Sequence, residues 1–175
     1  MEARSKFKAY LLGNRIVSNA SKANELYLQN RTGEKIDEKV NYSFIEGLYL
    51  LKKNKISLFK GKKKVSADSL MSLADKKEKN FFERYCVYKN LRDRGYTVKT
   101  ALKFGADFRV YEKGKLPGEE HAKWIVFPVY ETGSLTWHEF AAKNRVAHST
   151  KKNLLIAIVD EEGDVTYYEC QWLRP

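Results

Sequence analysis

The apolar run LLIAIV at residues 154–159 restricts the fold of this chain more than any other feature. Six consecutive apolar residues leave no polar face for water, so the run predicts a β-strand that is covered on both faces. Helical patterns over residues 75–95 and 136–147 can supply that cover. Together with further strand patterns, they predict a C-terminal domain of α/β or α+β class with a central mixed sheet. The strand patterns lie at residues 100–114, 123–131 and 165–173.

The first half of the chain contains shorter elements. Residues 8–19 predict two strands that are joined by a Gly-Asn turn. Ser43 and Glu46 form a capping box that opens a helix. Residues 56–74 continue with a strand, a basic turn, a second strand and a helix. This mixture predicts a small N-terminal α+β domain.

The pattern changes near residues 75–80, and no flexible linker is evident there. We therefore expect a basic N-terminal domain over residues 1–78 and a second, C-terminal domain over residues 79–175. Pro128 interrupts the strand pattern at residues 123–131, which predicts an edge strand or a bulge at that point.

The chain carries a formal net charge of +11, of which residues 1–80 contribute +9 and residues 81–175 contribute +2. A basic excess of this size favours a polyanionic partner, and nucleic acid is the commonest one. The densest charge cluster is either a solvated face or a pocket for phosphate or for an acidic protein segment. It consists of Lys52, Lys53, Lys55, Lys60, Lys62, Lys63 and Lys64.

The cysteine and hydropathy patterns exclude several classes of protein. The two cysteines, Cys86 and Cys170, lack the CxxC spacing of a structural zinc site, and we expect neither a metal nor a cofactor. No apolar run approaches the roughly 18 residues of a membrane-spanning helix. The charged start of the chain does not match a signal peptide. We therefore expect a soluble, cytoplasmic protein without a membrane partner.

His121 is the strongest candidate for chemistry among the three histidines. It ends a polar loop and leads into a strand pattern, whereas His138 and His148 lie in and just after a predicted helix. Tyr111 precedes the same loop on the other side. In the antiparallel hairpin that this arrangement implies, the side chains of Tyr111 and His121 can lie close together.

A tyrosine, a histidine and a lysine beside RNA suggest one specific reaction. The ribose 2′-hydroxyl can attack the adjacent phosphorus when a base takes its proton and an acid protonates the departing 5′ oxygen. Histidine, with a free pKa of about 6.5, suits the acid role, and a lysine ammonium can neutralise charge on the phosphate oxygens. Tyrosine as the base would need help from neighbouring cations, because a free phenol has a pKa of about 10. None of these steps requires a metal ion.

Three segments together resemble the archaeal tRNA-splicing endonuclease family: LKFGADFRVYEKG at 102–114, EEH at 119–121, and RVAHSTKKNLLIAIVDEEGDVTYYE at 145–169. The resemblance implies a catalytic triad in which Tyr111 is the general base and His121 the general acid. Lys152, the second lysine of AHSTKK, would stabilise the transition state. The implied substrate is pre-tRNA with a bulge–helix–bulge motif, and the implied products carry a 2′,3′-cyclic phosphate and a 5′-hydroxyl.

The resemblance also implies RNA-binding and assembly residues. Arg145 corresponds to an arginine that stacks on a bulged base, and Tyr167 is expected near the same site. The DEEGD turn corresponds to an acidic loop that docks into a basic groove on a neighbouring subunit, which implies a homotetramer built as a dimer of dimers. The acidic residues of this turn are Asp160, Glu161, Glu162 and Asp164.

Three alternatives remain open from the residues alone. The chain could be the catalytic subunit of a heterotetramer. It could also be a non-catalytic RNA-binding or structural subunit, although such a subunit should lack triad members. Finally, the acid-x-Lys patterns at residues 37–39 and 75–77 match the short signature of Mg²⁺-dependent nucleases.

Overall fold

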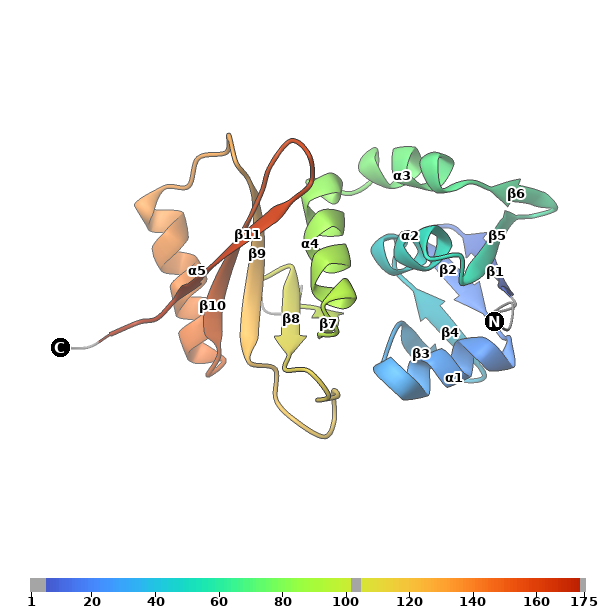
Figure 1. Cartoon of the computed structure of the whole chain (residues 1–175), viewed down its shortest axis with the longest axis horizontal. Helices are drawn as coiled ribbons and strands as arrows, with labels where there is room; N and C mark the ends of the chain where they lie inside the picture. The colour runs from blue at the N-terminus through green and yellow to red at the C-terminus, as the bar shows by residue number, and fades with distance from the viewer. Residues whose placement is uncertain (1–5, 102–104, 174–175) are drawn as a thin grey trace. The chain divides into compact units, whose positions relative to one another are not determined.

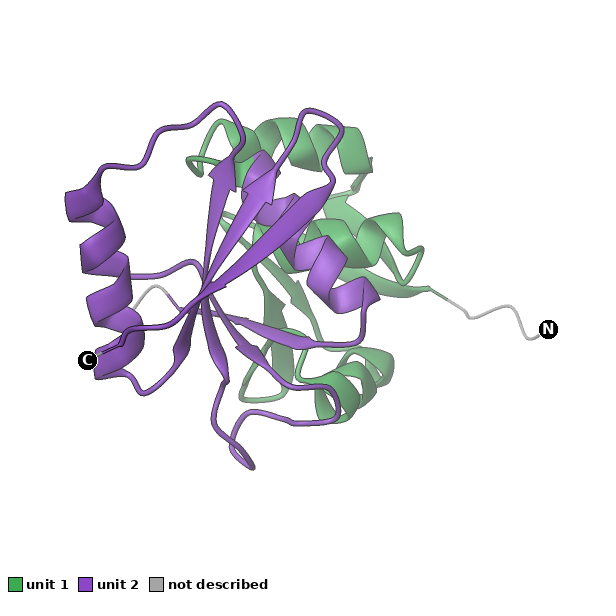
Figure 2. Cartoon of the chain, turned by 60° about the vertical axis from the view of Figure 1, so that its left-hand side comes forward, with its two compact units in different colours: residues 1–81 green, residues 82–175 purple. Residues whose placement is uncertain are grey.

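The computed structural model describes residues 6–101 and 105–173 (Figure 1). The chain divides into two compact units, residues 1–81 and residues 82–175 (Figure 2). Each unit combines helices with its own sheet, which confirms the predicted α+β class. Within the described ranges, every helix is too short or too polar to cross a lipid bilayer.

Unit 1 is built on a mixed sheet. In its described part the strand order is β3-β4-β2-β1-β5-β6; β1 and β5 are parallel, and the other neighbours are antiparallel. Gly13, with a left-handed φ of 61°, and Asn14 make the predicted turn between β1 and β2. The elements are β1 (Phe7–Leu12), β2 (Arg15–Ser18), α1 (Ser21–Asn30), β3 (Glu34–Ile36), β4 (Lys39–Tyr42), α2 (Phe44–Lys52), β5 (Ile56–Lys60), β6 (Lys63–Val65) and α3 (Ala67–Asp75).

The buried carboxylate of Glu46 takes part both in the capping motif of α2 and in a contact with a distant part of unit 1. Glu46 and Ser43 form the predicted capping box at the start of α2. In this box Glu46 Oε2 accepts hydrogen bonds from Ser43. Its second carboxylate oxygen, Oε1, accepts a hydrogen bond of 2.9 Å from the backbone N–H of Gly33. Because several donors satisfy this carboxylate, it can lie in the interior of unit 1 at low cost.

Unit 2 also contains a mixed sheet. In its described part the strand order is β11-β10-β9-β8-β7; β9 and β10 are parallel, and the other neighbours are antiparallel. Helix α4 begins at the boundary between the units, and α5 connects β9 to β10. The elements are α4 (Phe81–Asp93), β7 (Thr97–Thr100), β8 (Phe108–Tyr111), β9 (Trp124–Tyr130), α5 (Trp137–Ser149), β10 (Asn153–Val159) and β11 (Val165–Cys170).

Helices α4 and α5 cover opposite faces of the unit 2 sheet (Figure 1). Phe108 faces α4, where its ring centroid lies 6.0 Å from that of Tyr88. Ile125 and Leu154 face α5 and belong to an apolar cluster that includes Ala147 of that helix. Strand β10 lies between β9 and β11. The apolar run at residues 154–159 is therefore covered on both faces, as predicted.

The predicted helix over residues 75–95 is wrong in its first part. Helix α3 ends at Asp75, and α4 begins only at Phe81. Between them Asn80 adopts a left-handed φ of 53°, which a continuous right-handed helix cannot contain.

The prediction that Pro128 marks an edge strand is also wrong, since β9 lies between β8 and β10. The pairing of β9 with β8 ends at Val126, whereas its pairing with β10 continues through Pro128. The missing N–H of Pro128 therefore falls where the ladder with β8 has already ended.

Candidate active site

Three strand ends meet at one end of the unit 2 sheet: the C-terminal end of β8 and the N-terminal ends of β9 and β10. There the backbone N–H of Lys123 donates to the carbonyl of Val110 at 2.9 Å, and the Lys123 carbonyl accepts from Asn153 at 2.9 Å. Neighbouring strands lie about 4.8 Å apart. The topology therefore gathers the segments that carry the three predicted catalytic residues, Tyr111, His121 and Lys152.

Tyr111 is the last residue of β8, and its side chain is buried at 4% exposure. Arg109 lies two residues earlier on the same strand, and side chains two residues apart in a strand share a face. In register Arg109 lies opposite Ile125, whose side chain packs toward α5. Tyr111 and Arg109 therefore lie on the face of the sheet that α5 covers.

His121 is exposed and lies three residues before β9. The loop that carries it is closed by a 2.7 Å ion pair between Lys115 and Glu120, which lowers the pKa of the Glu120 carboxyl. A second ion pair, of 2.6 Å, joins Glu112 to Lys123 across the two arms of the loop. Of these ion pairs, the second connects parts of the loop on either side of His121.

Lys152 lies in the turn between α5 and β10 and is half-buried. Its ammonium donates a hydrogen bond of 2.7 Å to the carbonyl of Thr150. Burial, and then the positive charge of Arg109, lower the pKa of Lys152 below the ordinary value for a lysine. Lys151 before it has a left-handed φ of 54° and is exposed, so the two adjacent lysines differ in position. The cations Lys152 and Arg109 thus lie on the same face of the unit 2 sheet as Tyr111.

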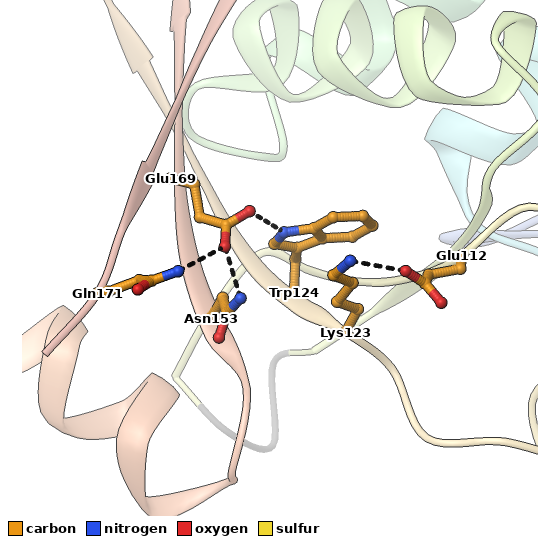
Figure 3. A network of polar contacts seen from close by, with 6 residues as sticks. All are labelled: Glu112, Lys123, Trp124, Asn153, Glu169 and Gln171. Atoms are coloured by element: carbon orange, nitrogen blue, oxygen red, sulfur yellow. Dashed lines mark hydrogen bonds and ion pairs between the residues drawn. The ribbon is translucent and has the colours of Figure 1, made fainter.

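A polar network links the starts of β9 and β10 to the end of β11 (Figure 3). Glu169 accepts hydrogen bonds from Trp124 Nε1 at 2.8 Å, from Asn153 Nδ2 at 2.6 Å and from Gln171 Nε2 at 3.4 Å. The hydrogen bond from Trp124 is the main cause that lowers the pKa of Glu169. The ammonium of Lys123 lies 4.8 Å from the centroid of the Trp124 ring. The ionised carboxylate of Glu169 therefore holds both Trp124 and Asn153. Trp124 directly follows Lys123, and Asn153 directly follows the candidate catalytic residue Lys152.

The two predicted RNA-binding residues lie in different surroundings. Arg145 is exposed on α5. Tyr167 on β11 donates its hydroxyl to Asn90 of α4 at 3.1 Å, and the guanidinium of Arg94 lies 5.8 Å from its ring centroid. Burial raises the pKa of the Tyr167 phenol. Tyr167 thus joins β11 to α4, and its contact with RNA stays a prediction.

The predicted acidic loop is the hairpin between β10 and β11. The Asp160 carboxylate accepts hydrogen bonds from the backbone N–H groups of Glu162 at 3.0 Å and Asp164 at 2.8 Å. Glu161, Glu162 and Asp164 are exposed. Among the described residues, one group of three acidic, histidine or cysteine side chains lies close enough together to hold a metal ion. It consists of Asp160, Glu162 and Asp164. This group lies at the opposite end of β10 from Lys152.

The sequence-based prediction missed Arg109 and Glu169. Arg109 could have been found from strand alternation, since it lies two residues before Tyr111 in the FRVY segment. Glu169 could not, because its partner Trp124 lies 45 residues away and no local pattern connects the two.

Comparison with known proteins agrees with this architecture. The family model described as tRNA intron endonuclease, catalytic C-terminal domain, matches residues 81–167. The model described as tRNA intron endonuclease, N-terminal domain, matches residues 7–71. These two matches fall on the two sheets described above.

Full-length relatives show the same likeness. The tRNA-splicing endonuclease of Thermococcus gammatolerans is 43% identical over 166 residues, which cover 94% of this chain and 97% of that protein. The tRNA-splicing endonuclease of Pyrococcus furiosus is 43% identical over 94% of this chain and 95% of that protein. That of Nanoarchaeum equitans is 39% identical over 95% and 98%. With both family domains matched and these relatives covering nearly the whole chain, this endonuclease belongs to the tRNA intron endonuclease family.

Proposed function

We propose that this endonuclease cuts pre-tRNA at exon–intron junctions, in a bulge–helix–bulge RNA, by metal-independent acid–base transesterification. The observation that carries the proposal is the common face of Tyr111, Arg109 and Lys152 at the end of β8 and the start of β10. Two cations beside a phenol suit a phosphodiester, because they can neutralise charge on its oxygens. In the described part of the chain, Arg109 Nε is also buried without a hydrogen-bond partner.

The proposed roles balance every proton and bond. Tyr111 takes the proton of the ribose 2′-hydroxyl, and the 2′ oxygen forms a bond to the adjacent phosphorus. The bond from phosphorus to the 5′ oxygen breaks, and His121 gives that oxygen a proton. Lys152 stabilises the charge on the phosphate oxygens in the transition state. The products are a 2′,3′-cyclic phosphate and a 5′-hydroxyl.

The decisive experiment is cleavage of a bulge–helix–bulge RNA in EDTA by the wild type and by His121→Ala. We expect the wild type to cut at both bulges and to leave cyclic phosphate ends. We expect His121→Ala to be slower by at least about a hundredfold, since a positioned proton donor contributes about 10²–10⁴-fold. His138→Ala is the matched control, because His138 is also an exposed histidine but lies in the first turn of α5.

Each opposite result has a definite meaning. Loss of wild-type cutting in EDTA would replace the proposed mechanism by a metal-dependent one. Normal cutting by His121→Ala would remove that residue from the acid role. An RNA that binds and stays intact would favour a non-catalytic subunit.

For the assembly we propose a homotetramer, in which the acidic loop of one chain docks on the basic first half of another. The exposed Glu161, Glu162 and Asp164 and the net charge of +9 over residues 1–80 are complementary in sign. Light scattering of the isolated chain is expected to give a mass near four chains. A mass near two chains would instead favour a heterotetramer with a second kind of subunit.

A further inference from the structure

The sheet of unit 1 has one covered face and one open face. Along β1 buried and exposed residues alternate strictly, and Lys8, Tyr10 and Leu12 are the exposed ones. On the covered face Gly47 of α2 packs so closely on the buried Ile16 of β2 that an added Cβ would collide with it. The exposed side chains of β1 therefore lie on the face opposite to α2, which we call the open face.

A row of side chains crosses the open face through Tyr10. In register, Tyr10 lies opposite Phe59 of β5 on one side and opposite Val17 of β2 on the other. The row continues from Phe59 to Lys64 of β6, and from Val17 to Asn41 of β4. Residues that lie opposite each other in a ladder share a face, so all five side chains lie on the open face.

The centre of this row is aromatic. The ring centroids of Tyr10 and Phe59 lie 6.1 Å apart, with their planes at 36°. Tyr10 is 41% exposed, and Leu12 beside it is 61% exposed. An apolar patch in the middle of a sheet is thus left open to water, which is typical of a binding surface. Nucleobases suit this surface, because every base has a π-face that can stack on an aromatic ring.

Basic side chains surround the aromatic centre. Lys8 lies on the open face of β1, and Lys64 of β6 ends the row. Arg15 of β2 lies opposite Leu12. Among the described strand residues of the open face, the acidic one is Glu34, which lies on the edge strand β3. The open face therefore matches a ligand that is negatively charged.

The combination of charge and aromatic rings favours unpaired RNA over two other polyanions. An acidic protein segment would meet the cations but would offer no planar groups for the two rings. Double-stranded RNA would present its backbone, while its bases stay stacked inside the helix. Single-stranded RNA offers phosphates and free base faces together, and sheets with central aromatic residues are a common platform for it.

We propose that the open face of the unit 1 sheet binds a single-stranded segment of RNA. Two bases stack on Tyr10 and Phe59, and the neighbouring phosphates lie at Lys8, Arg15 and Lys64. This site is built from unit 1 alone and holds RNA without cutting it. It therefore goes beyond the proposed cleavage reaction, whose candidate residues all belong to unit 2.

The test is the Kd of a fluorescein-labelled oligoadenylate RNA, measured by fluorescence anisotropy with the full-length wild type, Tyr10→Leu and Phe59→Leu. Leucine keeps an apolar side chain in the strand but removes the π-face. We expect each variant to raise the Kd by roughly 5- to 150-fold, the range for loss of one stacked base. Tyr10→Phe keeps the ring and should bind like the wild type. Trp137→Ala is the matched control, because Trp137 is an aromatic residue on α5 of unit 2 and is 85% exposed.

A second measurement locates the RNA. After irradiation, an oligoadenylate that carries one iodouridine should cross-link to peptides that contain Tyr10 or Phe59. Cross-links to unit 2 alone would overturn the proposal, as would an unchanged Kd in both leucine variants or an equal loss in Trp137→Ala. A smaller particle mass for Tyr10→Leu in light scattering would also overturn it, because the open face would then be a contact between chains.

The cleavage assay keeps this proposal apart from the proposed function. Tyr10→Leu should cut a bulge–helix–bulge RNA without single-stranded ends as fast as the wild type does, and a slower rate would mean that the open face is not a separate site. A wild type that binds oligoadenylate at Tyr10 but leaves the bulge–helix–bulge RNA intact would contradict the proposed function and support this one.

Discussion

Glu169 accepts a hydrogen bond of 2.8 Å from the indole nitrogen of Trp124, although the two residues lie 45 positions apart in the chain. The bond runs from the start of β9 to the end of β11 and so spans the start of β10 (Figure 3). Asn153, at the start of β10, donates to the same carboxylate at 2.6 Å. One carboxylate thus joins the starts of β9 and β10, the two strands that follow the candidate catalytic residues His121 and Lys152.

Replacement of Glu169 should therefore affect catalysis more than its surface position suggests. We expect Glu169→Ala to slow single-turnover cleavage about ten- to a hundredfold, because small displacements of positioned groups are costly. Glu169→Gln, which keeps one acceptor oxygen, should lie between this variant and the wild type. Thr166→Ala, an exposed change on the same strand, should leave the rate unchanged. Wild-type rates in Glu169→Ala would mean that the network does not position the site.

The ammonium of Lys152 should titrate at a lower pH than an ordinary lysine. Burial and the charge of Arg109 both disfavour its protonated form, so they lower its pKa. Arg109→Gln removes the second cause, and the titration midpoint of Lys152 should rise toward the ordinary value. The measurement is NMR titration of ¹³C-labelled lysine side chains, with Lys152→Arg used to assign the signal. A midpoint that does not move in Arg109→Gln would show that the two charges do not interact.

Gly163 in the acidic loop should not tolerate a side chain. Its φ is 83°, and an added Cβ would lie 3.1 Å from Cys86 Sγ and 3.5 Å from Phe82 Cζ. We expect Gly163→Ala to lower the free energy of unfolding by roughly 1–3 kcal/mol. Gly95→Ala has the same kind of strain, with φ 90°, but its Cβ would meet nothing within 4 Å. In denaturant unfolding Gly163→Ala should be the less stable of the two, and equal stability would contradict the close contact.

The acidic loop should control association. We expect Glu161→Lys combined with Glu162→Lys to lower the mass measured by light scattering, because like charges would then face each other across the proposed contact. Asp93→Lys combined with Glu119→Lys makes the same change in net charge at exposed positions of unit 2 outside the loop and should leave the mass unchanged. An unchanged mass in the loop variant would remove this loop from the proposed interface.

Local sequence motifs determined much of the fold. The capping box at Ser43 opens α2 where the sequence predicts, because the motif needs only four consecutive residues. Helix α5 begins at Trp137, within the predicted helical range of residues 136–147. The apolar run at residues 154–159 forms β10 for a similar reason, since an uninterrupted apolar strand has to be covered on both faces. The break at Asn80 was missed because residues 75–80 are all polar, so no apolar period indicates where the helix begins.

Only the tertiary structure decided how the candidate site comes together. The sequence by itself identified Tyr111, His121 and Lys152 as candidates, through residue type and resemblance. Their shared location depends on the parallel pairing of β9 with β10 and the antiparallel pairing of β8 with β9. The same pairing places Pro128 inside the sheet and Arg109 within electrostatic reach of Lys152. Strand order is set by the burial of whole faces against α4 and α5, which is a property of the assembled domain and not of any short segment.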